Sequence, residues 1–143
     1  MKGYKDCVLR VNLASRDIKK EPLNQDYIKQ YLGGEGYGIA LLWDEMPHTA
    51  DAFSPENILS FNTGPLTGTP TPSASRTSVV FMSPLTSTIG AANMGSHFGA
   101  ELKFAGYDSI VFTGRSDNPV YLFIDNDKVE LRPADHLWGL DTR

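Results

Sequence analysis

The sequence of 143 residues contains a single cysteine, Cys7. One thiol cannot form an internal disulfide, and an iron–sulfur cluster normally takes four thiolate ligands, so the chain cannot hold such a cluster by itself. The histidines His48, His97 and His136 are scattered, with no cysteine or second histidine at metal-ligand spacing. That arrangement disfavours a zinc site.

The chain also lacks any run of lysine or arginine, and its formal net charge is −4. Duplex nucleic acid and anionic membranes both need a clustered cationic surface, so neither is expected as a partner. No stretch is long and apolar enough to suggest a membrane span, and the charged start of the chain does not resemble a signal peptide. A cytoplasmic location is the expectation that remains.

What is present fits one soluble domain. Hydrophobic residues make up 41% of the sequence and charged residues 21%, which is ordinary for a globular protein. A folded chain of this length buries roughly 68–70% of the surface that its unfolded form exposes, which is enough for a real core. Trp43 and Trp138 are expected to anchor that core.

Alternating hydrophobic residues, turn residues and helix caps predict a series of short elements. Strands are expected at residues 7–13, 18–23, 58–61, 77–82, 109–113, 120–124 and 128–131, and helices at 24–32, 36–46 and 97–105. The first strand should bury only one face. These elements predict an α+β fold, with largely antiparallel sheets or hairpins and a few short helices packed on them. Asp141-Thr142 is typical of a helix start, so the domain is expected to be incomplete at its C-terminal end.

Two long stretches rich in Gly, Pro, Ser and Thr interrupt this pattern, GPLTGTPTPSAS (64–75) and SPLTSTIGAANMGS (83–96). Irregular segments of this length in a compact domain tend to be functional or disordered. Each contains apolar residues and follows a predicted strand, so we expect both to be ordered, irregular and functional.

The glycine-rich string GGEGYG (33–38) separates the first two predicted helices. It does not match the dinucleotide-binding spacing, and no strand precedes it. Glycines here could let the backbone approach a phosphate, or could serve a helix–helix turn that needs positive φ angles. The structural interpretation is favoured. The stretch at 64–75 likewise lacks the Lys-Ser/Thr ending of a P-loop.

Three residues beside the long stretches suit a polar ligand. Arg76 directly follows the first stretch, and its planar guanidinium can bind a phosphate or the edge of a heterocycle. Asn93 and Gly95 lie before a predicted helix, where glycine permits close backbone approach. A surface arginine and a turn asparagine explain the same residues equally well from local arguments.

Longer strings go beyond composition: GPLTGTPTPSASR (64–76), SPLT (83–86), AANMGSHFGAELKFAGYD (91–108), NPVYLFI (118–124) and HLWG (136–139). In this order and near this spacing, they resemble the N-terminal domain of the aldehyde:ferredoxin oxidoreductase family. The opening strings KGYKDCVLRVNL and YLGGEGYG resemble it too, so the similarity covers nearly the entire chain.

The resemblance implies a function for the whole protein. Members of this family hold tungsten, less often molybdenum, between two pterin cofactors through their dithiolene sulfurs. They carry one [4Fe–4S] cluster and oxidise aldehydes to carboxylates with ferredoxin as electron acceptor, while relatives act on other substrates. Residues 1–143 would be the pterin-cofactor-binding N-terminal domain. The cluster ligands lie in sequence absent here, so this chain alone should be inactive.

By the same resemblance, Arg76, Asn93 and Gly95 carry over as cofactor contacts. The backbone carbonyl of Asn93 would help to ligate a Mg²⁺ ion that bridges the two pterin phosphates, a hard cation that prefers oxygen ligands. No catalytic residue is assigned. The sequence departs from the family pattern at Met94 to His97, where Met94 is expected to pack beneath the cofactor.

The sequence leaves open what accompanies the chain. It could be an excised domain, a truncated product, or a split subunit that pairs with a large partner. One alternative to a domain of an enzyme is a pterin-binding module without activity of its own. Another is a structural protein that keeps the family fold but has lost the ability to bind the cofactor. In each case an uncovered apolar surface would favour self-association.

Overall fold

The computed structural model describes residues 2–141. The strands are β1 (Val8–Asn12), β2 (Ile18–Glu21), β3 (Leu59–Thr63), β4 (Thr77–Met82), β5 (Ile89–Met94), β6 (Ser109–Thr113), β7 (Val120–Asp125) and β8 (Lys128–Pro133). The helices are α1 (Gln25–Tyr31), α2 (Gly34–Glu45) and α3 (Phe98–Phe104). Eight strands and three helices in these described residues confirm the predicted α+β composition.

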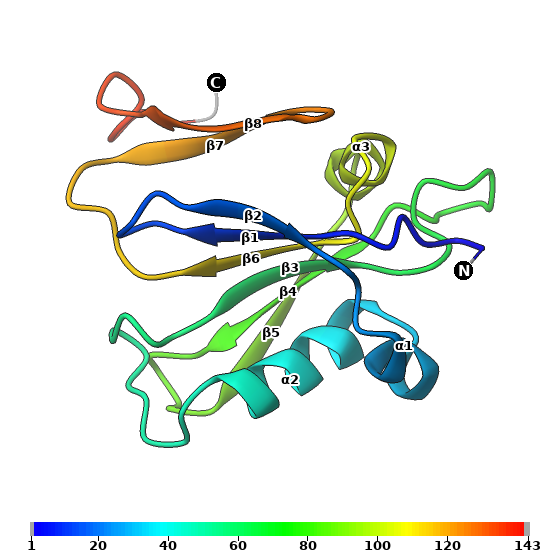
Figure 1. The fold of residues 1–143 in the computed structure, drawn as a ribbon, viewed down its shortest axis with the longest axis horizontal. Coiled ribbons are helices and arrows are strands. Elements are labelled where there is room, and N and C mark those ends of the chain that lie inside the picture. Colours follow the sequence, from blue (N-terminus) through cyan, green and yellow to red (C-terminus); the bar gives the residue numbers. More distant parts are fainter. Residues whose placement is uncertain (1, 142–143) are drawn as a thin grey trace.

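A six-stranded sheet in the order β2-β1-β6-β3-β4-β5 forms the centre of the molecule (Figure 1). Its neighbouring strands run antiparallel except β1 and β6, which are parallel. Strands β7 and β8 form a separate antiparallel hairpin. The largely antiparallel arrangement was therefore predicted correctly, with one parallel pair at the centre of the sheet.

Strand β1 is buried on both faces, whereas the sequence pattern predicted one buried face. Val8 belongs to the core on the α1–α2 side, and Leu9 and Val11 belong to the core on the opposite side. The reason is position, because β2 and β6 flank β1 inside the sheet and layers cover both faces. Successive side chains of a strand point to opposite faces, so both sets become buried.

Helices α1 and α2 cover one face of the sheet (Figure 1). Asn24 caps α1 as predicted, since its side-chain oxygen accepts hydrogen bonds from the backbone N–H groups of Asp26 and Tyr27. Arg10 of β1 links the sheet to the end of α2 by donating to Glu45 at 2.5 and 2.6 Å. The hydrogen bonds to Glu45 raise the pKa of the Arg10 guanidinium.

Helix α2 buries only part of its apolar surface. Tyr37, Gly38, Leu41 and Leu42 face the sheet, whereas Trp43 is 64% exposed. Trp138 is 76% exposed as well, so the prediction that both tryptophans anchor the core is wrong. The Trp43 ring lies 5.2 Å from the His48 ring, centroid to centroid.

Helix α3 and the β7–β8 hairpin cover the opposite face of the sheet (Figure 1). Leu102 of α3 and Tyr107 are buried there against Leu122 and Leu131 of the hairpin. The Tyr107 hydroxyl also donates to the backbone oxygen of Asn126 at the hairpin turn, at 2.9 Å. The helix and the hairpin were both predicted within two residues of their observed ends.

The second Gly/Ser/Thr-rich stretch is not irregular throughout, as was predicted. Its residues 89–94 form β5, which pairs with β4 over six residues at the edge of the sheet. Small side chains such as Ala91 and Ala92 give little sequence signal for a strand, and the pairing with β4 supplies the order.

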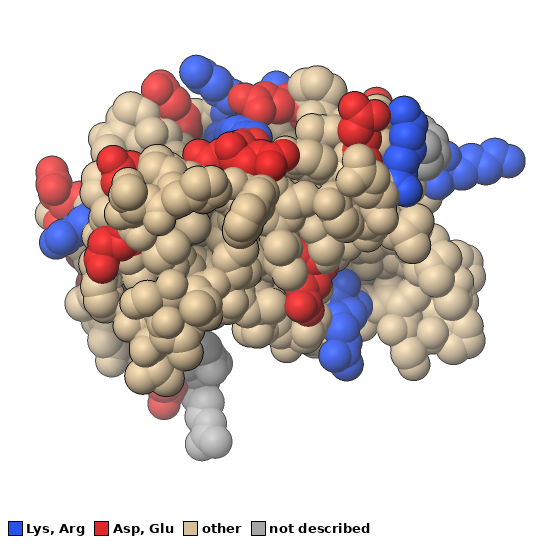
Figure 2. Space-filling view, turned by 90° about the horizontal axis from the view of Figure 1, so that it is seen from below, with Lys and Arg blue, Asp and Glu red and all other residues tan. Residues whose placement is uncertain are grey.

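Figure 2 views the molecule from the side of α1 and α2, where Lys and Arg are scattered rather than gathered in a patch. None of the helices within residues 2–141 is long and apolar enough to cross a membrane. The predicted helix start at Asp141-Thr142 falls partly outside the described residues.

Candidate functional site

The three residues predicted to contact a cofactor come together at one end of the β4–β5 pair. Asn93 lies in β5 directly opposite Ser78, and Met94 lies opposite Thr77. The same register carried one residue further places Gly95 opposite Arg76. Two long stretches, 64–75 and 83–96, are thus joined by the sheet at this position.

Ser78 and Asn93 share one face of the sheet, because they are opposite each other in the β4–β5 pair and their side chains are hydrogen-bonded at 3.0 Å. Arg76 directly precedes β4, and Gly95 directly follows β5. Val80, two positions after Ser78 on the same strand, faces α2, because a methyl group on Gly38 would lie 2.7 Å from Val80 Cγ2. The candidate site therefore opens on the α1–α2 side, beside the start of α2.

A cleft of about 390 Å³ occupies this position. Its walls come from the link between α1 and α2, the stretch 64–75 and the start of β4, with Leu32, Gly34, Gly64, Pro65, Leu66, Thr67, Thr71, Pro72, Ser73, Ala74, Arg76 and Ser78 lining it. Arg76 is exposed and is the one charged residue among them.

The stretch 64–75 is ordered by its own hydrogen bonds, as predicted. The buried Thr67 hydroxyl accepts from the backbone N–H of Gly64 at 3.1 Å and donates to the backbone oxygen of Arg76 at 3.2 Å. The backbone N–H of Gly68 donates to the Ala74 carbonyl at 3.0 Å. Thr67 thereby ties both ends of the stretch together and fixes the backbone that carries Arg76.

The glycine-rich string 33–38 has the structural role that was favoured. Gly33 has a φ of 141°, and a methyl group there would lie 2.9 Å from the Thr63 carbonyl oxygen. Helix α2 begins at Gly34, on the cleft wall, without a side-chain cap. The positive end of its dipole therefore adds to the charge of Arg76, and both favour an anion in the cleft.

Helix α3 lies on the opposite side of the sheet from α1 and α2, and it packs closely against the start of β4 (Figure 1). A methyl group on Gly99 would lie 2.3 Å from Thr77 Oγ1 and 3.0 Å from the Ser75 carbonyl oxygen. Only glycine permits this approach, so Gly99, the second residue of the string FGAELKFAGYD, packs against the stretch 64–75 and β4. Thr77 Oγ1 is buried and has no hydrogen-bond partner in the described part of the chain.

The same string contains a buried ion pair between Lys103 and Asp108, whose side chains are 5% and 3% exposed. Lys103 Nζ also donates to the Gly3 carbonyl at 2.7 Å, and Asp108 Oδ2 accepts from the Lys5 backbone N–H at 2.9 Å. This pair holds the start of the chain against the end of α3. Composition alone does not indicate such a pair, because buried lysines are rare.

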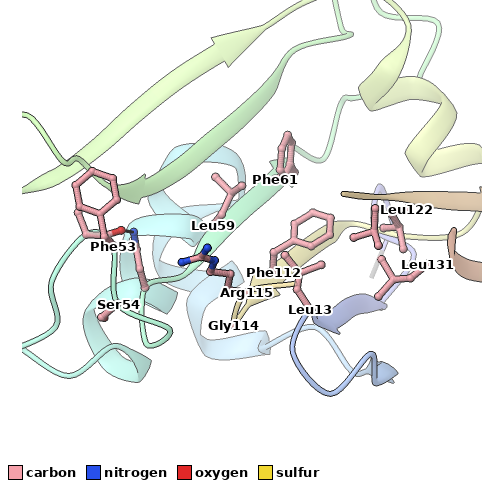
Figure 3. A pocket seen from close by; sticks show the side chains of 13 residues that line it. Leu13, Phe53, Ser54, Leu59, Phe61, Phe112, Gly114, Arg115, Leu122 and Leu131 are labelled. Carbon is pink, nitrogen blue, oxygen red and sulfur yellow. Dashed lines mark hydrogen bonds between the residues drawn. The ribbon is translucent and has the colours of Figure 1, made fainter. Parts of the chain in front are cut away.

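A second cavity, of about 430 Å³, lies on the hairpin side of the sheet (Figure 3). It is mostly apolar, and its wall includes Phe61, Phe112, Leu122 and Leu131, with Arg115 at one side. None of the residues predicted to bind a cofactor lines it. The two cavities therefore lie on opposite sides of the sheet, and each has mostly apolar walls with a single arginine, Arg76 in the cleft and Arg115 in the hairpin-side cavity.

Ser78 was missed by sequence reasoning although it lines the cleft. Its hydroxyl donates to Asn93 Oδ1 at 3.0 Å across the β4–β5 pair. Its position in an alternating strand marked it as facing one side, but only the register with β5 shows that its neighbour is Asn93. That register joins residues 15 positions apart and could not be inferred while 83–96 was taken as irregular.

The cleft fits an anionic, oxygen-rich ligand better than a bare metal ion. A methyl group on Gly95 would meet nothing within 4 Å, so the space next to this backbone position is open. No group of three or more His, Cys, Asp or Glu side chains that could hold a metal occurs in residues 2–141. Any metal bound here would use backbone or ligand oxygens, as Mg²⁺ accepts.

Comparison with known proteins gives consistent results over nearly the whole chain. Residues 8–143 match the sequence profile of the aldehyde ferredoxin oxidoreductase N-terminal domain. A tungsten-containing aldehyde ferredoxin oxidoreductase from Pyrococcus abyssi is 51% identical over 139 residues, which is 97% of this chain and 23% of the relative. The WOR-like subunit of an aliphatic sulfonate oxidoreductase from Pyrococcus furiosus is 39% identical over 143 residues, covering 98% and 23% respectively.

A solved structure shows the same fold. The active-site complex BamBC of benzoyl coenzyme A reductase, bound to 1,5-dienoyl-CoA, superposes with a TM-score of 0.94 at 43% identity. The match covers 96% of this chain and 21% of that one. The chain thus spans less than a quarter of the length of these similar proteins.

Proposed function

The chain belongs to the aldehyde ferredoxin oxidoreductase family, as the N-terminal domain of such an enzyme, and from this premise we propose that it holds a tungsten- or molybdenum-bis-pterin cofactor. The cofactor would lie over the cleft at the end of the β4–β5 pair. The single observation that carries this proposal is that Arg76, Asn93 and Gly95, from two separate stretches, lie at the same end of the β4–β5 pair, where Arg76 lines the cleft.

Each residue has a role that suits its position. The exposed Arg76 guanidinium donates several hydrogen bonds in one plane, which suits a phosphate of the pterin. The backbone carbonyl of Asn93 would help to hold a Mg²⁺ ion beside the cofactor, and Gly95 would leave space for a ligand to approach the backbone. The uncapped start of α2 adds a favourable field for the same anion.

The cofactor, once bound, supplies the two-electron chemistry that converts an aldehyde to a carboxylic acid. The residues of this chain bind and orient it, and none of them is assigned a proton transfer or a bond to substrate. A [4Fe–4S] cluster, its cysteine ligands and the contact with ferredoxin belong to sequence beyond this chain. Residues 1–143 therefore act as the pterin-binding domain of a longer protein or of a complex with a large partner subunit.

A second candidate is an oxidoreductase of the same family with a different substrate. The similarity to the BamBC complex of benzoyl coenzyme A reductase, at 43% identity, favours it. The higher identity of 51% to a tungsten-containing aldehyde ferredoxin oxidoreductase favours the aldehyde. Both candidates require the same cofactor cleft, and they differ in residues outside this chain.

The proposal is tested with Arg76→Ala in the full-length protein. Each charged hydrogen bond to a phosphate is worth about 1.5–3 kcal/mol, so the variant should bind the cofactor roughly 10- to 100-fold more weakly. Tungsten and molybdenum are measured by mass spectrometry, and pterin by its fluorescence after oxidation. We expect a variant that folds and purifies normally but has lost most of its metal and pterin.

Arg115→Ala is the matched control, because Arg115 is also exposed but lines the apolar cavity on the other side of the sheet. It should retain metal and pterin at the wild-type level. Equal cofactor content in the wild type, Arg76→Ala and Arg115→Ala would show that the cleft beside β4 does not hold the cofactor.

A further inference from the structure

A groove runs between α1 and α2, on the side of the molecule that Figure 2 shows. It has a volume of about 660 Å³, and none of the residues that line it also lines the cofactor cleft. Tyr27 and Tyr31 belong to its α1 wall, and Ile39 and Trp43 belong to its α2 wall. The groove is therefore a separate feature from the proposed cofactor site.

The helical repeat turns the groove side of α2 away from the sheet. Ile39 and Trp43 are four positions apart, as are Gly36 and Ala40, and residues at this spacing are neighbours on one helix face. The buried Leu41 belongs to the opposite side, which packs on the sheet. Because glycine and alanine are small, the α2 face is hollow between α1 and the ridge that Ile39 and Trp43 form.

The large side chains of the groove are exposed. Trp43 is 64% exposed, Tyr31 46% and Ile39 36%. Tryptophan and tyrosine are enriched where proteins bind one another, because their rings supply a large and rigid contact area. A continuous exposed apolar surface of this kind favours a protein partner.

The charged residues that line the groove are both acidic. Asp26 pairs with Lys29 at 3.2 Å on the surface, whereas Asp44 has no ion pair among residues 2–141. Asp44 Oδ2 accepts a hydrogen bond from the Tyr27 hydroxyl at 2.5 Å. Burial raises the pKa of that hydroxyl, and the hydrogen bond to Asp44 adds to the rise, so Tyr27 remains a donor. Asp44 Oδ1 is left for a cation from outside.

We propose that the α1–α2 groove is the docking surface of a separate partner protein, which inserts a lysine or arginine side chain flanked by apolar side chains. The cation would contact the Asp44 carboxylate and the Trp43 ring. The apolar neighbours would cover Ile39 and Tyr31. This inference goes beyond the proposed function, because it concerns a protein partner and not the cofactor.

The chemistry of the groove selects this occupant. A cation over an aromatic face is attracted by the ring, and an arginine can stack on the ring while it donates to a carboxylate. Phosphate-rich partners are disfavoured, because Asp26 and Asp44 would repel them and no lysine or arginine lines the groove. Charged residues are depleted in the core of permanent interfaces, so a groove with exposed carboxylates suits a separable partner with a polar rim.

The test is site-specific photo-crosslinking in the full-length protein, produced in its own source so that its natural partners are present. A photoreactive benzoylphenylalanine replaces Gln30, which is exposed and lines the groove from α1. Mass spectrometry then identifies the crosslinked peptides. We expect one defined segment of another protein, in which a lysine or arginine is flanked by apolar residues.

Three further substitutions in the crosslinking protein test which groups hold that segment. Trp43→Ala should lower the crosslink yield roughly tenfold, because a tryptophan in an interface often carries much of the binding. Asp44→Lys should lower it by more than about tenfold, because it brings like charges together. Glu35→Lys is the matched control: it makes the same charge change at an exposed residue of α2 outside the groove, and should keep the yield within about twofold.

Thermal unfolding midpoints and cofactor content are measured for the same variants. Trp43→Ala removes an exposed side chain and should unfold like the wild type, so it tests the groove even if Asp44→Lys is less stable through loss of the Tyr27 hydrogen bond. Metal and pterin content should not change, because neither residue lines the cofactor cleft. Absence of cofactor from the wild type would thus contradict the proposed function and leave the crosslink unaffected.

Several results would overturn the inference. A crosslink to a later segment of the same polypeptide or to a second copy of it would show a different occupant. A crosslinked segment without lysine or arginine, or no crosslink at all, would contradict the proposed chemistry. Equal yields from Asp44→Lys and Glu35→Lys would show that the groove carboxylate does not hold the partner.

Discussion

At the scale of single residues, the buried ion pair between Lys103 and Asp108 connects the end of α3 to the start of the chain. Both side chains are nearly fully buried, and removal of one partner leaves the other as an uncompensated charge. Such a change costs about 3–5 kcal/mol, so we predict that Lys103→Met lowers the free energy of unfolding by about that amount. Chemical denaturation of the variant and the wild type measures the difference.

Lys20→Met is the control for that prediction, because Lys20 pairs with Asp127 at 2.6 Å on the surface, where the aspartate side chain is fully exposed. The hydrogen bond from Lys20 lowers the pKa of the Asp127 carboxyl, but solvent screens exposed pairs. The free energy of unfolding of this control should be almost the same as that of the wild type. Equal stability of both Lys→Met variants would contradict the structural role of the buried pair.

At the residue scale, the assignment of Arg76, Asn93 and Gly95 to a cofactor site stays a prediction, and contacts formed only by the tertiary structure were missed. Local chemistry suggested Arg76, Asn93 and Gly95 only weakly, and the family resemblance selected them. Their meeting at one end of β4 and β5 is a result of the structure. Ser78 could not be selected, because a serine in a strand has no special meaning until its cross-strand neighbour is known.

At the scale of elements, the contact between α2 and the sheet depends on Gly38. A methyl group there would lie 2.4 Å from Asn62 Nδ2 and 2.7 Å from Val80 Cγ2. Glycine is normally the poorer residue in a helix, by about 0.5–1 kcal/mol relative to alanine. Here we predict the opposite sign, with Gly38→Ala destabilising the protein by about 1–3 kcal/mol because α2 must move away from β3 and β4.

Thermal or chemical unfolding measures this change, with Glu35→Ala as the control on the exposed surface of the same helix. Glu35 lies in the first turn, where an acidic residue contributes about 0.3–1 kcal/mol, so the control should cost no more than that. Stabilisation by Gly38→Ala would show that α2 does not approach the sheet as closely as described.

Most elements were predictable because their local signals are strong. Asn24 marks the start of α1, and the alternation in 77–82 and 109–113 gives β4 and β6 at their observed bounds. Strand β5 was missed because its small residues carry no strand propensity, and its order comes from β4. The exposure of Trp43 was missed because helical spacing does not say which of two hydrophobic sides faces the sheet.

At the scale of the whole molecule, several large hydrophobic side chains outside the cleft are exposed. Phe53 is 83% exposed and lines the hairpin-side cavity (Figure 3). Trp43 of α2 and Leu32, at the end of α1, are 64% and 65% exposed. Exposed apolar surface of this kind favours contact with other protein. Self-association of the isolated chain therefore stays a prediction, as does its pairing with the rest of a longer enzyme.

The overall class of the molecule was the most predictable level. The order of strings such as GPLTG and FGAELKFAGYD indicated the family, and the structure explains why these strings recur together. Thr67 connects the two ends of the stretch 64–75 by hydrogen bonds, and Gly99 allows α3 to pack against that stretch. The Lys103–Asp108 pair then holds the start of the chain against the end of α3. The aldehyde substrate and the ferredoxin acceptor were implied by the family resemblance alone, and both stay predictions.

The measurement that tests the central claim most directly is the tungsten, molybdenum and pterin content of the full-length protein purified from its own source. The account predicts tungsten or molybdenum together with pterin in stoichiometric amounts, lost from the Arg76→Ala variant and kept in Arg115→Ala. A pure, folded full-length protein that contains neither metal nor pterin would contradict it, and would mean that the cofactor cleft of the family persists here without its cofactor.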